Sequence, residues 1–266
     1  MTFNRDQARA TYLSVEHKLR AKSAALLLTI ENRLPRIMTF WFFLALSACG
    51  LRIATSKIHA APDLSTVLPY ILLVGAPLAS MGLALIWFAR GDQLPQPSTR
   101  LALVGRWQSV GRDVASRHPL YGTSGIMVSL LVGMLLNVPV RALEYLAAMP
   151  ALSGRVPEWL STLHMMMTLD VVLLTSLYTV AFVAALKRVP LFPRLLAAVW
   201  LVDIVMQLGI ASAVAGTAGL PQQVATALHT LLDGNIKKVL ISVCLWLPYL
   251  LLSKRVNVTY RHRVEA

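Results

Sequence analysis

An arginine and a glutamate lie inside an otherwise apolar part of the sequence. In "NVPVRALEYLAAM", residues 137–149, Arg141 precedes Glu144 by three residues. Residues with this spacing share one face of a helix. Pro139 lacks an amide hydrogen and is expected to kink that helix, and Asn137 could donate to a carbonyl that the kink frees. The stretch therefore has the groups needed for an ion pair or a proton-binding site within a membrane.

Further polar residues interrupt two later apolar stretches. Asp170 lies near the start of one, and Asp203 and Gln207 lie one helical turn apart near the middle of the next. At 1.5 Å per residue, Arg141 and Asp170 lie about 9 to 12 Å from the outer ends of their spans. A charged residue at the centre of a membrane helix costs about 2.5–3.5 kcal/mol, so these groups should face one another or water. We predict an intramembrane polar cluster of Arg141, Glu144, Asp170, Asp203, Gln207 and Asn137.

The predicted cluster has three interpretations. Arg141 could bridge Glu144 and Asp170 in a structural ion-pair cluster that fixes helix packing. Alternatively, one arginine faces up to three carboxylates, so unless a lysine such as Lys237 reaches in, one carboxylate is unmatched and could serve a proton- or cation-coupled pathway. The third interpretation is a catalytic site or a site for a substrate headgroup.

Other candidate chemistry is weaker, and we predict no catalytic, cofactor or metal residues. The sequence contains no GxSxG, HExxH, Walker or GxGxxG motif. The run "HMMM", residues 164–167, has copper-ligand types but no second Met- or His-rich element. Cys49 and Cys244 have no metal spacing.

The elements that must position these residues are membrane helices. The chain has 266 residues, of which 56% are hydrophobic and only 14% charged. About 20 apolar residues cross a hydrocarbon core of about 30 Å, and the apolar runs lack the alternation of barrel strands. We therefore predict an all-α, polytopic membrane protein. The six predicted spans are 37–54, 67–89, 126–149, 164–186, 195–216 and 239–252.

The positive charges predict the orientation. Nineteen of the 25 lysines and arginines fall in residues 1–36, 90–123, 187–194 and 254–266. These regions share one side of a six-span chain, so the positive-inside rule puts both termini in the cytoplasm. The net charge of +13 is thus explained by topology and by anionic lipid headgroups as partners, without nucleic acid.

The chain divides into four predicted parts. Residues 1–36 hold apolar residues at helical spacing beside basic ones, which predicts an amphipathic helix on the inner membrane surface. Packing of that helix against the cytoplasmic ends of the bundle is an equal alternative. A two-span unit (37–90), a cytoplasmic linker rich in proline and polar residues (91–123) and a four-span unit (124–266) follow. The outer loop before the last span is expected to hold a short interfacial helix that Gly234 closes.

The end of the last span has a distinctive pattern. In "WLPYLLLSKRVNVTY", Trp246 and Tyr249 are expected interfacial anchors, and Lys254 and Arg255 end the span among headgroups. With "ALKRVPLFPRLLAAVW", residues 185–200, this pattern resembles the bacterial four-span domain-of-unknown-function family 2569. The resemblance covers about residues 125–263. It implies a bacterial inner membrane protein and supplies no activity.

The sequence alone favours a non-enzymatic, transport-related or envelope accessory protein, with a membrane protein partner or a second copy as a possible associate. One alternative is a membrane enzyme that acts on a lipid or lipid-linked substrate through the carboxylates near Arg141. Another is a purely structural scaffold. A transporter needs a cavity that reaches the polar cluster, an enzyme needs a lateral opening toward headgroups, and a scaffold needs only a dry, mutually paired cluster.

Overall fold

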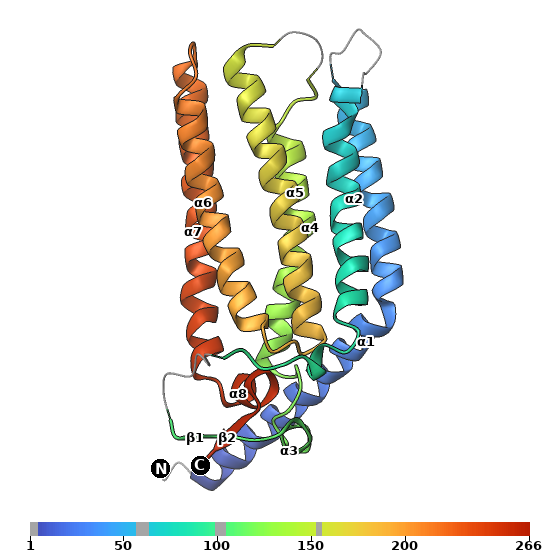
Figure 1. Ribbon diagram of the computed structural model, residues 1–266, viewed down its shortest axis with the longest axis vertical. Helices are drawn as coiled ribbons and strands as arrows, with labels where there is room; N and C mark the ends of the chain where they lie inside the picture. The colour runs from blue at the N-terminus through green and yellow to red at the C-terminus, as the bar shows by residue number, and fades with distance from the viewer. Residues whose placement is uncertain (1–4, 57–63, 99–104, 153–155) are drawn as a thin grey trace.

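The computed structural model describes residues 5–56, 64–98, 105–152 and 156–266. Nearly all regular structure in these ranges is helical (Figure 1). In chain order the elements are α1 (Arg5–Ala54), α2 (Leu64–Trp87), the 3-10 turn η1 (Gly91–Gln93), β1 (Trp107–Ser109), α3 (Arg112–Ser116), α4 (Ile126–Ala148), α5 (Glu158–Leu186), α6 (Phe192–Ala215), α7 (Gln222–Leu252), α8 (Lys254–Arg261) and β2 (Arg263–Glu265).

The prediction of an all-α, six-span membrane protein is confirmed. Six helices are long and apolar enough to cross a membrane, namely the part of α1 from Ala21, most of α2, and α4 to α7. Many of their large apolar side chains are exposed, including Phe40, Ile86 and Leu201. That exposure fits a lipid environment, where apolar side chains need no protein cover.

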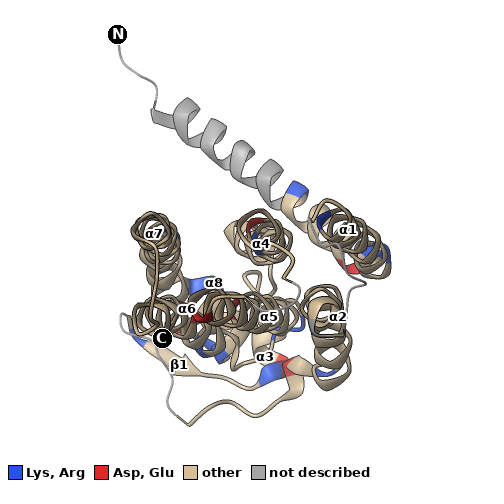
Figure 2. Cartoon of the chain, turned by 90° about the horizontal axis from the view of Figure 1, so that it is seen from above, with Lys and Arg blue, Asp and Glu red and all other residues tan. Residues whose placement is uncertain are grey.

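The helices form two rows of three when seen along the bundle (Figure 2). One row is α7, α4 and α1, and the other is α6, α5 and α2. Helix α5 packs against α2, α4 and α6 and is the most buried span. The predicted two-span unit is therefore packed along the four-span unit, with α2 on α5 and α1 on α4.

Helix α1 continues from the predicted interfacial segment into the first span without a break. Pro35 lies inside it, and α1 bends near the lower end of the bundle (Figure 1); a proline without an amide hydrogen explains such a bend. Just before Pro35, Ile30 and Leu34 are buried and Glu31 pairs with Lys187 at 3.2 Å. This last part of the segment thus packs against the end of the bundle.

Helix α7 is much longer than predicted. It begins at Gln222 and passes through Gly234, so the expected interfacial helix closed by this glycine is wrong. A glycine within a helix costs roughly 0.5–1 kcal/mol relative to alanine, a modest penalty in a 31-residue helix. The flanking Asp233 and Lys237 form an ion pair at 2.6 Å across one turn. The extension brings polar residues of α7 alongside the bundle.

A small cap closes the end of the bundle that carries both termini (Figure 1). We call this the inner end and the opposite one the outer end. Strands β1 and β2 pair antiparallel, with Gln108 opposite Val264. Residues 256–262 are buried, and the Tyr260 hydroxyl donates to the Ala185 carbonyl at 2.8 Å. The predicted linker and the C-terminal tail are thus joined in one structure.

The four residues predicted as interfacial anchors lie at this inner end. Trp246 and Tyr249 are partly buried and pack edge to face, with ring centroids 6.0 Å apart. Lys254 is exposed and pairs with Glu265 at 2.8 Å. Arg255 donates to the Leu120 and Gly122 carbonyls and to Ser124. Arg255 therefore closes the loop that leads into α4.

Burial also affects the arginine that ends α8. Arg261 lies 4% exposed in the cap and donates to Asn257 at 3.1 Å. Burial, together with the nearby positive charges of Arg263 and Arg194, lowers the pKa of Arg261 to about 10. The side chain is still protonated at neutral pH, so the inner cap contains a buried positive charge.

Candidate functional site

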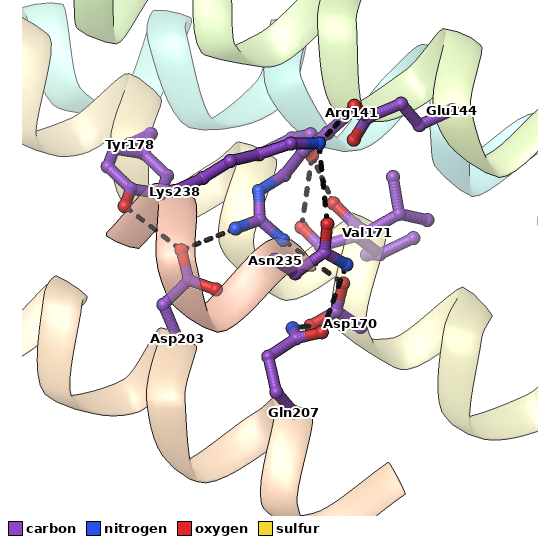
Figure 3. Close-up of polar contacts among 11 residues, drawn as sticks. Arg141, Glu144, Asp170, Val171, Tyr178, Asp203, Gln207, Asn235 and Lys238 are labelled. Atoms are coloured by element: carbon purple, nitrogen blue, oxygen red, sulfur yellow. Dashed lines mark hydrogen bonds and ion pairs between the residues drawn. The ribbon is translucent and has the colours of Figure 1, made fainter. Parts of the chain in front are cut away.

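An arginine held by two carboxylates forms the centre of the candidate site (Figure 3). Arg141 of α4 donates through one terminal nitrogen to Asp170 of α5 at 3.1 Å and through the other to Asp203 of α6. The Tyr178 hydroxyl donates to the same oxygen of Asp203 at 3.0 Å. The Arg141 guanidinium also lies 5.9 Å from the centre of the Tyr178 ring. Three helices are thus joined at one charged group.

Amide side chains extend this centre to α7. Gln207 donates to the second oxygen of Asp170 at 2.9 Å, and Asn235 donates to Gln207 at 3.1 Å (Figure 3). Lys238 lies 3.5 Å from the Asn235 oxygen and pairs with Glu144 of α4 at 2.5 Å. The last contact bridges α7 and α4, which lie in the same row of the bundle (Figure 2).

The structure brings together five of the six residues of the predicted cluster. The pairing differs from the expected one, because Arg141 binds Asp203 and Asp170 and does not bridge to Glu144. Glu144 lies at the edge of the cluster, and its side chain is 45% exposed. Its lysine partner is Lys238, while Lys237 pairs with Asp233.

Asn137 lies outside the connected network. No described side chain or backbone group bonds its buried carboxamide oxygen. It lines a separate cavity nearer the inner end, described below.

Sequence reasoning missed Tyr178, Asn235 and Lys238. Tyr178 lies eight residues after Asp170 on α5, a spacing that keeps two residues near the same face of a helix. Asn235 and Lys238 are three residues apart, as expected for one helix face, but they were assigned to the outer loop and the start of the last span. The early start of α7 places Asn235 within a helix beside the bundle, which the sequence did not predict.

With both carboxylates ionised, the buried part of the site would carry one excess negative charge. Arg141 is one positive charge between two carboxylates, and its side chain is 12% exposed against 8% for Asp170 and 0% for Asp203. Among the described residues, the second oxygen of Asp203 and the Arg141 Nε have no partner. An uncompensated buried charge is costly in a medium of low dielectric constant. A bound proton would neutralise the set.

Two cavities approach the site from opposite ends of the bundle. The outer cavity, of about 30 Å³, is lined by Arg141, Asp170 and Asn235 together with Glu144, Tyr145 and apolar side chains. The inner cavity, of about 100 Å³, is lined by Tyr178 with residues that include Asn137, Ser242 and Trp246. A cavity needs about 10–15 Å³ to hold one water molecule. Both cavities thus have space for water.

A second polar group lies nearer the outer end. The Tyr145 hydroxyl lies 2.7 Å from the Thr168 hydroxyl and 3.3 Å from Nε2 of His164, the histidine of "HMMM". Arg52 at the end of α1 donates twice to the Met149 carbonyl, at 2.8 and 2.9 Å. Within the described ranges, no three His, Cys, Asp or Glu side chains gather as metal ligands would. The hydrogen bonds of Tyr145 and Arg52 thus connect the outer ends of α4 with those of α5 and α1.

Comparison of the chain with protein families, curated proteins and solved structures found no match. The resemblance of residues 125–263 to domain-of-unknown-function family 2569 therefore stays a prediction.

Proposed function

We propose that this integral membrane protein is transport-related and that the buried set Arg141, Asp170 and Asp203 binds a proton on a pathway through the bundle. The observation that carries the proposal is the position of this set between two water-sized cavities. Asp170 lines the outer cavity, and Asp203 accepts a hydrogen bond from Tyr178, which lines the inner one. Intramembrane carboxylates of this kind are typical of proton relays.

The charge balance supports the same proposal. Two carboxylates around one arginine leave one excess negative charge, and one proton restores neutrality. Both carboxylates contact Arg141, so one proton on either of them balances the set. A proton that enters from the outer cavity at Asp170 and leaves through Tyr178 passes from one cavity to the other. The cavity volumes of about 30 and 100 Å³ fit water and are small for an organic substrate.

Flux measurements test the proposal. The purified protein is placed in sealed vesicles that contain a pH-sensitive dye, and a pH gradient or a membrane potential is applied. We expect proton flux that Asp203→Asn and Asp170→Asn each reduce at least tenfold. Glu144→Gln is the matched control, since it makes the same carboxylate-to-amide change on the exposed side of the network.

The scaffold alternative predicts a different result. Mutual pairing of Arg141 with Asp170 and Asp203 is what a structural cluster also requires. In that case the wild-type protein gives no flux above empty vesicles, and neither asparagine variant changes it. Flux of sodium or potassium without proton flux would also contradict the proton pathway.

We further propose a bacterial inner membrane location with both termini in the cytoplasm. Both termini lie at the inner end of the bundle (Figure 1), where most of the lysine- and arginine-rich segments of the sequence meet. The positive-inside rule makes this end cytoplasmic. A reporter active only in the cytoplasm should be active when fused after Ala266 and inactive when inserted after Leu220; the reverse result would contradict the orientation.

A further inference from the structure

A lateral groove lies between α1, α2 and α4, away from the polar network. Its volume is about 200 Å³, and its walls include Trp41, Leu44, Pro77, Leu78, Leu135 and Pro139. No residue of the groove lines either cavity described above. Apart from Thr179, the side chains that form its walls are apolar. The groove is therefore a separate space from the two cavities of the proposed proton pathway and needs its own explanation.

Prolines explain why the helices leave this space. Pro77 lies inside α2 and Pro139 inside α4, and both line the groove. Each lacks the amide hydrogen of a helical hydrogen bond, and its ring crowds the preceding turn, which disfavours close packing of the three helices at this level. At the rim, Phe40 is 68% exposed and Leu136 is 55% exposed. Because these rim side chains are exposed, the groove is open at the side of the bundle, toward the lipid.

The groove lies in the inner half of the bundle. On α1 its wall begins at Ile37, two residues after the proline near which the helix bends. On α2 its wall reaches Met81, six residues before the helix ends at Trp87. At 1.5 Å per residue this is about 9 Å from that helix end, the depth of acyl chains in the inner leaflet.

Two arginines stand at the inner end of the groove. Arg33 precedes Ile37 by four residues and Arg36 precedes Phe40 by four, so each lies on the helix face of a residue that lines the groove. Both arginines are exposed. A phosphate headgroup at this level would face two positive charges while its acyl chain extends along the apolar walls.

We propose that the groove binds one acyl chain of an anionic phospholipid of the inner leaflet, with Arg33 and Arg36 attracting its phosphate. The volume of about 200 Å³ is below the usual range for compact organic ligands and suits a stretch of a single hydrocarbon chain. An apolar groove with adjacent arginines fits an anionic lipid and does not require a protein partner.

Photo-crosslinking tests this site. The full-length protein is placed in phosphatidylcholine vesicles that contain a small fraction of phosphatidylglycerol with a photoactivatable group on its acyl chain. Mass spectrometry then locates the crosslinks. We expect them to concentrate on residues 37–44, 77–81 and 135–139, and to fall about fivefold when the probe is the corresponding phosphatidylcholine. This comparison uses only the wild-type protein.

Variants add a second, independent measurement. Leu78→Trp fills the groove and should remove most of its crosslinks, whereas Leu245→Trp, at an exposed position of α7, should leave them unchanged. Arg33→Gln with Arg36→Gln should remove the preference for phosphatidylglycerol. Crosslinks as frequent on α7, at Ile241 and Leu245, as in the groove would overturn the proposal. Equal labelling by the two lipids would overturn it as well.

Discussion

Arg141 and Asp203 lie 62 residues apart in the sequence, yet they form an ion pair in which the Asp203 side chain has no exposed surface. The same arginine binds Asp170, so one guanidinium links α4, α5 and α6. This arrangement makes the stability of the bundle and the proposed proton pathway depend on the same charges. The two roles can be separated by the variants below.

Removal of the arginine should destabilise the protein strongly. Arg141→Met leaves Asp170 and Asp203 buried without their cation, and loss of one partner of a buried pair costs about 3–5 kcal/mol. We expect a decrease of this size in the free energy of unfolding in detergent. The triple variant R141M/D170N/D203N should recover most of it, because no unpaired charge remains. A decrease below about 1 kcal/mol for Arg141→Met alone would contradict a buried ion pair.

The pair at the outer edge of the network should matter little for stability. Lys238 and Glu144 are 61% and 45% exposed, so solvent and headgroups screen their interaction. Lys238→Ala should change the free energy of unfolding by about 0–1 kcal/mol. Lys237→Ala, which breaks the more exposed pair with Asp233, is the matched control. An effect of Lys238→Ala as large as that of Arg141→Met would place Lys238 among the essential charges.

The tyrosine beside Asp203 should affect transport more than folding. Tyr178→Phe keeps the ring near Arg141 and removes only the hydroxyl that donates to Asp203. Its cost in stability should be about 1.5–3 kcal/mol, the range for a hydrogen bond to a charged group. Proton flux in vesicles should fall at least tenfold, because the link between Asp203 and the inner cavity is lost. Wild-type flux in a folded Tyr178→Phe protein would contradict this route.

The inner cap should depend on one hydroxyl. Tyr260 is 1% exposed and donates to the Ala185 carbonyl at 2.8 Å. Tyr260→Phe should lower the free energy of unfolding by about 1 kcal/mol. Tyr121→Phe is the control, since the buried Tyr121 hydroxyl has no partner among the described residues. Its removal should be neutral or stabilising. Equal losses in the two variants would show that the Tyr260 bond adds nothing.

Hydropathy, together with the free-energy cost of placing a charge in lipid, was sufficient to predict the six spans and most residues of the polar cluster. Long apolar runs in lipid must be helices, and the cost of isolated charges requires groups such as Asp170 and Asp203 to find partners. The choice of partner could not be predicted, because it depends on how the helices pack against one another. In the structure Lys238 of α7 pairs with Glu144, while Arg141 pairs with Asp170 and Asp203.

The burial of the C-terminal tail could not be predicted from the sequence. The stretch "VNVTYRHR", residues 256–263, has polar residues at many positions and follows the two charged residues that end the last span, so no local pattern predicts its burial. In the structure it is mostly buried, because α8 packs its Val256 and Tyr260 into the core beside Ala185, and the following strand β2 pairs with β1 of the segment before α4. Contacts between segments about 150 residues apart leave no local pattern in a sequence. The lateral groove was not predicted either, because it depends on how α1, α2 and α4 pack against one another.

Infrared spectroscopy of the reconstituted protein tests the central claim most directly. A protonated carboxyl group has a carbonyl stretching band that a carboxylate lacks, so the band reports whether the buried set holds a proton at neutral pH. We predict that the wild-type protein and Glu144→Gln share such a band, and that Asp203→Asn and Asp170→Asn both lack it, because either change already balances Arg141. Spectra without this band in the wild-type protein, or with the same band in all four proteins, would contradict proton binding by this set.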